Sequence, residues 1–460
     1  MRFHTVLSTL LIVILAAPVA AQEIPRYDMQ QCLTRAIAAN PQMASAKQQI
    51  YGAQEGVRAA GAAFLPVGTA TYTSVDSWTK IPQANSSSLA TLTNVQTATP
   101  TSYSWKNNNY IKLLTLDLNV SQPLFTGFRL LSSFQQAKLA KEQADALYRR
   151  TELTLLRSVE TAFLTLLQAR ANVKSNQDSV TRLRSQLQVT QAFYDVGLRP
   201  RLDVLQAQSD LATAEEGLLS AQNSVDIQLV QLNSLLNIPL DQNVEYVGEL
   251  DYAPFTMALK DALDEAYKNR PDVYIALKSV EIAEKSATIA LSPALPQLSA
   301  SYDYIRQSDQ WGMRQDPSLS SSRGSFADAQ QVTLTASWRA WDWGNTMFTY
   351  RQAQDATRKL QADLGNLRLT VGLDVKTQYL NIQDAAKRIM VARTGVDAAA
   401  EGYRMAVARY QAQVGTNTDV LTSQAQLSRA EFQLTQAMTD FRIAIANLFY
   451  SIGRKSLTLS

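Results

Sequence analysis

Apolar side chains recur every seven residues along two segments of the chain, and the second segment repeats the spacing of the first. The apolar positions of the first segment are Val159, Leu166, Val173, Val180 and Leu187. Adding 216 to each number gives Val375, Ile382, Ile389, Val396 and Tyr403. An apolar repeat of seven residues is typical of long helices that pack along one seam. The constant offset indicates that the chain contains two copies of one structural unit.

Each copy is predicted to contain a long helix and a shorter return helix. These helices are expected at about 130–194 and 203–236 in the first copy and at about 346–410 and 419–450 in the second. An interrupted helical stretch precedes each long helix, at 28–64 and 256–292. Pro41 and Pro271 interrupt these stretches, and proline suits the first position of a new helix. Two short helices placed end to end beside one long helix would build a uniform cylinder of coiled coil.

The period of the apolar side chains changes to two in four short segments, which predicts strands. The expected strands are 67–75, 114–120, 297–305 and 331–341, with an exposed Ser/Thr/Asn-rich loop at about 79–109. This alternation is typical of a soluble sandwich, or of a transmembrane barrel with lipid outside and water inside. Four strands cannot close a barrel alone, and lipid does not tolerate open edges, so a membrane location requires several chains.

The start of the chain, residues 1–21, resembles a secretory signal peptide. Arg2 and His4 form a polar start, residues 10–17 form an apolar core, and Val19-Ala20-Ala21 resembles a cleavage site. The apolar core is too short for a membrane-spanning helix. We therefore expect an exported protein, organised as signal peptide 1–21, first repeat 22–239, connector 240–255 and second repeat 256–460.

Composition excludes several kinds of chemistry. His4 is the only histidine and would leave with the signal peptide, which removes Ser-His-Asp catalysis and histidine-based zinc sites. Cys32 is the only cysteine, so no intramolecular disulfide can form, and we expect a small buried helix residue there. Loss of Arg2 lowers the formal charge from +3 to +2, which gives no indication of nucleic-acid binding. No cofactor and no metal site is predicted.

Two runs at the expected turns between helices carry a family resemblance. They are Tyr194–Leu205 (YDVGLRPRLDVL) and Arg409–Leu421 (RYQAQVGTNTDVL). Both resemble the periplasmic tip motifs of TolC-type outer-membrane efflux proteins, the outer-membrane factor family. Together with the doubled helices and one strand hairpin per copy, the resemblance covers essentially the whole mature chain. It implies a mainly α fold with a small β part, in which coiled coils form an α-barrel and a homotrimer pools twelve strands in one transmembrane β-barrel.

The resemblance also implies where a periplasmic adaptor docks. The residues of the two expected docking tips are Val196, Gly197 and Leu198 in the first, and Val414, Gly415 and Thr416 in the second. Glycine tolerates tight turns and close backbone approach, although it also simply terminates helices. Gly197 follows Tyr194 by three positions, as in the family, whereas Gly415 follows Tyr410 by five. This departure predicts a second tip of different shape.

The expected gate consists of Asp203, Tyr410, Asp419 and Thr422. Asp419 matches the position of an acidic ring at the narrowest point of the family's tunnel. Thr422 occupies the position at which the best-known family member has a second aspartate. Asp203 and Tyr410 match positions whose polar links hold neighbouring coils together. Gly415 replaces an arginine of that network, and Arg199 and Arg201 are both candidates to substitute for it. In a purely structural interpretation, Asp203 and Asp419 are N-caps of the helices that they precede.

The resemblance implies a passive exit duct in the outer membrane of a Gram-negative bacterium, projecting into the periplasm. A periplasmic adaptor and an inner-membrane pump would recruit it, for efflux or for type I secretion, and outer-membrane lipid would surround its strands. The alternative from the residues is a periplasmic coiled-coil adaptor or scaffold without a pore. An exported enzyme would need paired carboxylates or lysine chemistry, and the chain shows no compact constellation of that kind.

Overall fold

The computed structural model describes residues 25–80, 83–84, 103–104, 108–308 and 327–455. The expected signal peptide, 1–21, lies outside the described residues. Within the described stretches, no helix is both long and apolar enough to cross a lipid bilayer.

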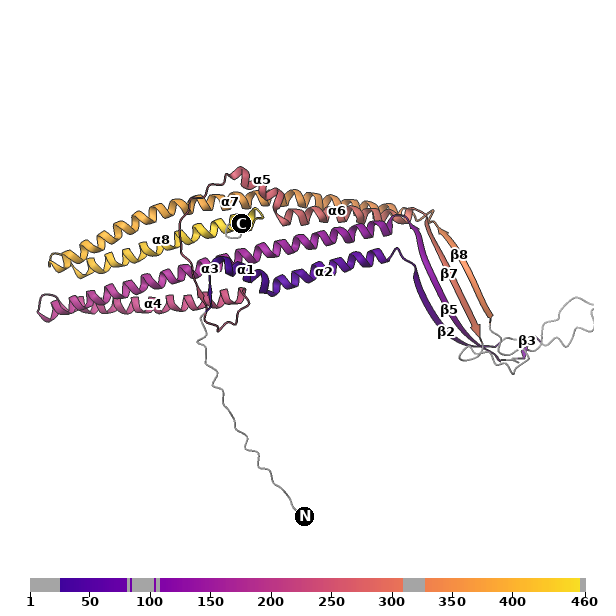
Figure 1. The fold of residues 1–460 in the computed structure, drawn as a ribbon, viewed down its shortest axis with the longest axis horizontal. Coiled ribbons are helices and arrows are strands. Elements are labelled where there is room, and N and C mark those ends of the chain that lie inside the picture. Colours follow the sequence, from indigo (N-terminus) through magenta and orange to yellow (C-terminus); the bar gives the residue numbers. More distant parts are fainter. Residues whose placement is uncertain (1–24, 81–82, 85–102, 105–107, 309–326, 456–460) are drawn as a thin grey trace, which may run out of the picture. The chain divides into compact units, whose positions relative to one another are not determined.

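The helices follow the duplicated sequence pattern (Figure 1). They are α1 (Met29–Ala39), α2 (Pro41–Ala62), α3 (Arg129–Asp195) and α4 (Arg201–Leu235), then α5 (Leu259–Asn269), α6 (Pro271–Leu291), α7 (Asn345–Gln411) and α8 (Asn417–Ser451). α3 and α7 each contain 67 residues, and α4 and α8 each contain 35. The helices predicted from the seven-residue repeat are therefore confirmed, with ends that differ by only a few residues.

Proline begins the second helix of each copy, as predicted. Pro41 is the first residue of α2 and Pro271 the first of α6. Asn40 holds the break between α1 and α2, because its side chain accepts a hydrogen bond from Gln42 N at 2.8 Å and donates one to the Leu235 carbonyl at 2.9 Å. The interruption is thus tied to the end of α4.

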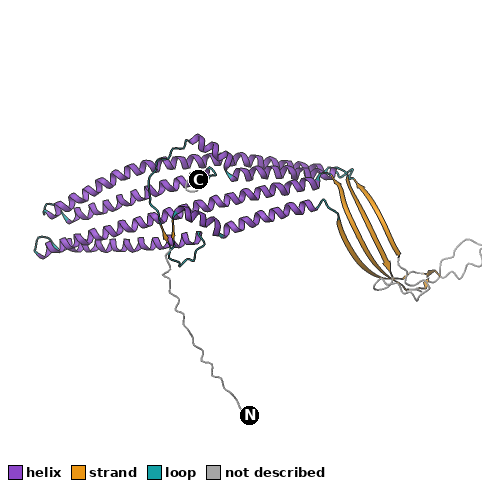
Figure 2. Cartoon of the chain, in the orientation of Figure 1, coloured by secondary structure: helices purple, strands orange, loops and turns teal. Residues whose placement is uncertain are grey.

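Four strands form one antiparallel sheet in the order β2-β5-β7-β8 (Figure 2). They are β2 (Val67–Lys80), β5 (Asn108–Thr126), β7 (Gln297–Ser308) and β8 (Ala327–Ser337). The prediction that the fourth strand runs to Trp341 is wrong. The strand ends at Ser337, after which the Trp338 indole donates to the Ala294 carbonyl at 3.1 Å.

Short strands were missed by the sequence pattern. β3 (Gln83–Ala84) pairs with β4 (Tyr103–Ser104) inside the segment expected to be a loop. β1 (Arg26–Tyr27) pairs in parallel with β6 (Glu245–Tyr246), which ties the start of the described chain to the predicted connector. Strands of two residues are too short to show a period of two, so pattern analysis cannot detect them.

An apolar core surrounds α1, the middle of α3 and the end of α4. Cys32, Leu33, Leu166, Leu232 and Leu236 in this core are fully buried. Burial raises the pKa of the Cys32 thiol to about 12, so the thiol is protonated at neutral pH. The expectation of a small buried cysteine in a helix is confirmed.

The described chain divides into two compact units, and each draws on both repeats. One comprises Met1–Lys47, Leu147–Pro271 and Leu367–Ser460, and the other Gln48–Ala146 and Asp272–Asn366. The first unit holds the turns between the long helices and their return helices. The second holds the four-stranded sheet with the helical segments next to it. The repeat boundaries expected at 22–239, 240–255 and 256–460 stay a prediction.

The duplication extends to the backbone where a strand passes into a long helix. Gly127 and Phe128 have φ of 59° and 67°, and the corresponding residues of the second copy, Trp343 and Gly344, have φ of 57° and 81°. A side-chain oxygen then caps each helix. Thr126 Oγ1 accepts from Leu130 N at 3.2 Å, and Asp342 Oδ2 accepts from Thr346 N at 2.9 Å. The two copies therefore share the same turn with different residues.

Gly127→Ala is expected to destabilise the strand-to-helix turn by about 2 kcal/mol, because the position combines a left-handed backbone with no room for a methyl group. A Cβ at Gly127 would lie 2.5 Å from the Ser292 carbonyl oxygen. Gly68→Ala is the matched control, since a Cβ at Gly68 meets nothing within 4 Å. Thermal unfolding in detergent measures both, and equal midpoints would contradict the explanation.

Candidate gate at the helical tips

The α3–α4 turn and the α7–α8 turn lie next to each other at one end of the first unit. Figure 2 shows both turns at the same end of the helices, and Arg199 Nη2 of the first turn donates to the Gly415 carbonyl of the second at 2.6 Å. Every expected site residue lies in these two turns or in the helices next to them. The geometry of the turns therefore decides how the four helices are held together at this end.

Both long helices end in the same hydrogen-bonded turn. Leu198 N donates to the Phe193 carbonyl at 2.8 Å, and its counterpart in the second copy, Val414 N, donates to the Arg409 carbonyl at 3.0 Å. The left-handed residue of the first turn is Gly197, with φ of 77°. In the second turn it is Gln413, with φ of 63°. This is the common way to end a helix, with glycine favoured at the left-handed position.

Gln413, not Gly415, is therefore the structural counterpart of Gly197. Gly415 serves a different purpose, because a Cβ there would lie 3.1 Å from both Arg409 Cβ and Tyr410 N. Glycine at 415 thus lets the turn approach the end of α7 closely, where a methyl group would force its neighbours to shift by a few tenths of an ångström. The prediction of a second tip of different shape is wrong, because the two turns share one backbone shape. The glycine has moved by two positions in the second.

Tyr410 lies at the centre of a buried cluster near the tips. Its side chain is fully buried, and its hydroxyl donates to Thr190 Oγ1 at 3.1 Å. The ring of Phe193 lies 5.6 Å from the Tyr410 ring, centroid to centroid, and the Arg199 guanidinium lies 5.0 Å from the ring centroid. The cluster thus joins α3 and α7 through one hydroxyl and one cation over an aromatic face.

Asn417 extends this cluster to the beginnings of α4 and α8. Its side chain is buried, and it accepts from Gln186 Nε2 at 2.9 Å and donates to the Asp203 carbonyl oxygen at 3.1 Å. Asp203 therefore enters the network through its backbone. Among the hydrogen bonds of the described residues, none joins the Asp203 carboxylate to the Tyr410 hydroxyl. The Asp203 carbonyl oxygen is connected to the Tyr410 hydroxyl through Asn417 and Thr190, whose Oδ1 and Oγ1 atoms lie 3.4 Å apart.

Of the two arginines considered as substitutes, Arg199 is the one inside the cluster. It contacts both the Tyr410 ring and the Gly415 carbonyl, so it bridges the two turns. Arg201 is exposed at the first position of α4. A charged donor to a carbonyl forms a stronger hydrogen bond than a neutral one.

Asp419 belongs to a capping box. Thr416 is the N-cap of α8, Asp419 N donates to Thr416 Oγ1 at 3.1 Å, and Thr416 N donates to Asp419 Oδ2 at 3.0 Å. These bonds from Thr416, with a smaller contribution from Arg409, hold the pKa of Asp419 below its ordinary value. The interpretation of Asp203 and Asp419 as N-caps is wrong, because both are the third residue of their helix.

Thr422 lies away from the buried cluster. It is exposed and lines an open groove of about 720 Å³ between α3, α4 and α8. Asp210, Gln206 and Gln424 line the same groove. Within the described part of the chain, no group of three or more His, Cys, Asp or Glu side chains is placed to hold a metal ion.

Sequence reasoning missed Thr190, Gln186 and Asn417, which carry most of the buried polar contacts. Thr190 and Gln186 lie on a helix that was predicted from its apolar residues, so its polar residues carried no signal. Their partner Asn417 belongs to the other copy of the repeat. No local signal marks such a pair. Gln413 could have been found, because the offset of 216 that aligns the long helices places it on Gly197.

The chain belongs to the outer membrane efflux protein family, which matches residues 32–237 and 262–454. It is an outer-membrane channel protein of efflux and secretion that extends into the periplasm. The family consists of transport ducts, and its TolC-type members act as trimeric channels with periplasmic adaptors and inner-membrane pumps. The alternative of a pore-free periplasmic adaptor does not fit this membership.

Individual relatives agree with this assignment. The chain is 24% identical over 351 residues to the outer membrane protein TolC of Vibrio cholerae, which covers 75% of this chain and 77% of that protein. It is 24% identical over 426 residues to the alkaline protease secretion protein AprF of Pseudomonas aeruginosa, covering 91% and 82%. The solved structure of the outer membrane protein VceC from Vibrio cholerae matches with a TM-score of 0.75 at 19% identity, covering 93% and 96%.

Substitutions at the two left-handed positions are expected to have opposite effects on stability. Gly197→Ala should destabilise the first tip by about 1 kcal/mol, and Gln413→Gly should stabilise the second by a similar amount, because only glycine adopts this backbone without a steric cost. Amide hydrogen exchange of the last turns of α3 and α7 measures both effects. Exchange changes of the same sign in the two variants would contradict the structural equivalence of Gly197 and Gln413.

Proposed function

We propose that three copies of this chain form a passive exit duct, which an adaptor and an inner-membrane pump recruit and which catalyses nothing. The observation that carries this proposal is the four-stranded sheet. Among the described residues, its two outer strands, β2 and β8, each have a partner on one side only. Lipid does not tolerate open strand edges, so the sheet requires further copies to complete it.

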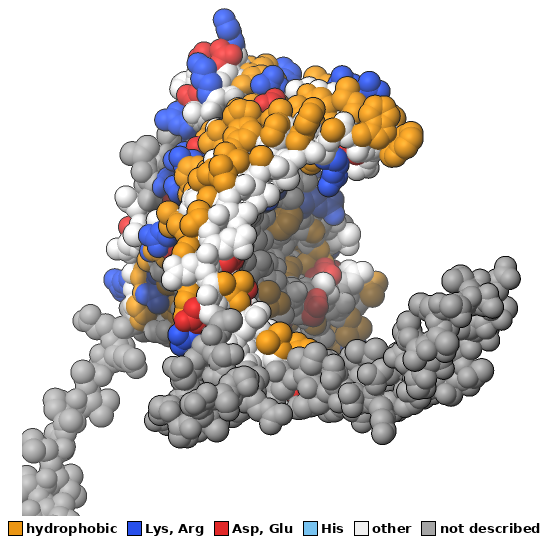
Figure 3. Space-filling view, turned by 90° about the vertical axis from the view of Figure 1, so that its right-hand side faces the viewer, with side chains coloured by type: hydrophobic (Ala, Val, Ile, Leu, Met, Phe, Trp, Pro, Cys, Tyr) orange, Lys and Arg blue, Asp and Glu red, His pale blue; other side chains and the backbone are white. Residues whose placement is uncertain are grey.

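The two faces of the sheet support a location in lipid. Val332 and Leu334 on β8 are 79% and 66% exposed, and their neighbours across β7 are Tyr302 and Ala300. The opposite face carries Asp303, whose carboxylate accepts a hydrogen bond from the Asn119 amide. Figure 3 shows hydrophobic side chains along the outer band of a hollowed surface and acidic side chains inside the hollow. An apolar outside and a polar inside are typical of a membrane barrel.

Aromatic side chains gather where the strands pass into helices. Phe125, Phe128, Trp338, Trp341 and Trp343 are all exposed in the single chain. Aromatic girdles mark the water–lipid boundary of outer-membrane barrels. These residues support placing the periplasmic surface of the membrane at the junctions after β5 and β8.

The helices of the first unit also carry large apolar side chains that are exposed to solvent in the single chain. Exposed apolar residues on α4 are Leu202, Leu205, Leu219, Ile227 and Val230, and those on α7 are Leu369, Leu373, Leu380, Met390, Val391 and Met405. Soluble monomers rarely expose so many large apolar groups along one element. The proposed trimer covers them by packing α4 of one copy against α7 of the next.

We infer that the closed periplasmic entrance is held by Asp203 and Tyr410 through the buried cluster, while Asp419 and Thr422 face the passage. Rupture of the cluster frees the α7–α8 pair from the α3–α4 pair. The adaptor docks on the tips Val196–Leu198 and Val414–Thr416. Val196 and Val414 are each 68% exposed, which suits a small apolar docking surface.

Asp203→Ala combined with Tyr410→Phe is expected to raise the single-channel conductance of the purified protein in planar bilayers. The tyrosine change removes the bond to Thr190, and the aspartate change removes a charge beside the backbone bond to Asn417. Tyr194→Phe is the control, because Tyr194 lies on the same helix end but is exposed. A double variant that conducts like wild type would contradict the role of Asp203 and Tyr410 in holding the entrance closed. A wild-type protein that never conducts would contradict the duct itself.

Cation selectivity is expected to persist from neutral pH down to the ordinary aspartate pKa of 3.8 and to fall only below it. The depressed pKa keeps Asp419 ionised as the pH falls, and three such carboxylates near one axis attract cations. The capping bonds of Asp419 likewise stabilise α8 above this pH and are lost as the pH falls through the lowered pKa.

Reversal potentials measured across a salt gradient test this pH dependence. Asp419→Asn should show weak selectivity at every pH, because it lacks the titrating charge. Wild-type selectivity that disappears well above pH 3.8 would contradict this prediction, because another group would then carry it or repulsion among the three carboxylates would outweigh the capping bonds.

A further inference from the structure

Three polar side chains lie seven residues apart on α8, and each is bonded to α3. They are Asn417, Gln424 and Glu431. The seven-residue spacing places them on one face of the helix, along the seam that faces α3. Such seam positions are ordinarily apolar, and a polar residue there lowers stability in exchange for a specific arrangement. We call these three contacts the polar ladder.

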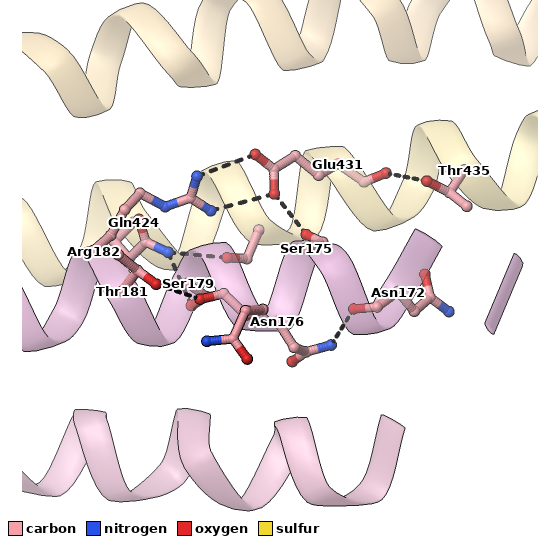
Figure 4. A network of polar contacts seen from close by, with 11 residues as sticks. Asn172, Ser175, Asn176, Ser179, Thr181, Arg182, Gln424, Glu431 and Thr435 are labelled. Carbon is pink, nitrogen blue, oxygen red and sulfur yellow. Dashed lines mark hydrogen bonds and ion pairs between the residues drawn. The ribbon is translucent and has the colours of Figure 1, made fainter. Parts of the chain in front are cut away.

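The second and third contacts of the polar ladder are shown in Figure 4. Gln424 Nε2 donates to Ser179 Oγ at 3.0 Å. The Glu431 carboxylate accepts from Ser175 Oγ at 2.6 Å and from the Arg182 guanidinium at 3.3 Å and 3.5 Å. Gln424 is only 3% exposed, and Arg182 and Glu431 are partly buried, so the ladder lies within the seam.

The polar ladder leaves part of its hydrogen-bonding capacity unused. Gln424 Oε1 and Arg182 Nε are buried and have no hydrogen-bond partner among the described residues. Buried polar atoms in proteins are ordinarily paired, and an unpaired one raises the energy of the state that contains it. The closed seam is therefore held less firmly here than a fully satisfied network would hold it.

Buried apolar side chains lie among the ladder residues on both helices. Val420 and Leu427 on α8 and Leu183 on α3 are buried. Separating apolar side chains exposes them to water, whereas a separated hydrogen-bonding pair can exchange each partner for water at little net cost. The polar contacts are therefore the part of this segment that separates most easily.

We propose that Gln424, Glu431 and Arg182 are positioning residues of the gate, and that the polar ladder is the releasable part of the α3–α8 seam. On opening, the contacts of the polar ladder between α8 and α3 break together with the buried cluster at the tips. This inference rests on the proposed duct function. It adds that the contacts broken on opening extend two heptads along α8, from Asn417 to Glu431.

The test uses variants of the full-length protein that shift the gate in opposite directions. Glu431→Ala leaves the partly buried Arg182 without its carboxylate, and it should raise the ratio of open to closed time in planar bilayers by about fivefold or more. Gln424→Leu with Ser179→Ala replaces both partners of one contact by apolar groups. This pair should lower the same ratio by about fivefold, because an apolar seam resists separation.

Gln426→Leu is the matched control, because Gln426 is exposed two positions along the same helix. Glu431→Gln should return the ratio toward wild type, since an amide oxygen still accepts from Ser175. A merely structural role would lower the thermal midpoint of all ladder variants without moving the ratio in two directions.

The outcomes distinguish failure of the polar ladder proposal from failure of the duct proposal. If Tyr410→Phe with Asp203→Ala conducts more than wild type while the ladder variants match Gln426→Leu, the polar ladder proposal is overturned and the duct remains. If neither wild type nor the tip variant conducts, the duct proposal fails and the polar ladder proposal fails with it.

Discussion

The two unpaired edges of the four-stranded sheet are the constraint on which the rest of this protein depends. In the part of the chain that the structure describes, β2 and β8 each leave one side without a partner, although the chain acts in the outer membrane. An unsatisfied backbone group in hydrocarbon costs several kcal/mol, so one copy cannot place this sheet in lipid alone. Pooling strands between copies resolves the problem, as in the proposed trimer. In that trimer, the exposed apolar side chains on α4 and α7 would be buried between neighbouring copies.

Duplication supplies the second organising feature, because it puts the same helix lengths and the same turns in both halves. At the tips, two helix ends with the same hydrogen-bonded turn therefore meet, although their residues differ. Gly197 and Gln413 share one backbone shape, whereas Gly415 brings its carbonyl within reach of Arg199. In the proposed gate, the closed state depends on a few polar contacts, while the apolar core around α1 and α3 maintains the fold.

The long helices and the four main strands could be predicted because their signal is periodic and local. The seven-residue repeat located α3 and α7 within a few residues, and the period of two located β2, β5, β7 and β8. The polar cluster could not be predicted, because Gln186 and Asn417 are 231 positions apart and neither belongs to a local pattern. The paired strands β1 and β6 are too short to carry a period. Family resemblance named Tyr410 and Asp203 but did not show that Thr190 and Asn417 connect them.

Amide hydrogen exchange of the sheet in the purified detergent-solubilised protein tests the central claim most directly. If copies pool their strands, the outward-facing amides of β2 and β8 are hydrogen-bonded to neighbouring copies. They should then exchange as slowly as the amides of the inner strands β5 and β7. Fast exchange confined to β2 and β8 would show that the edges remain open, and it would contradict the shared sheet and the duct built on it.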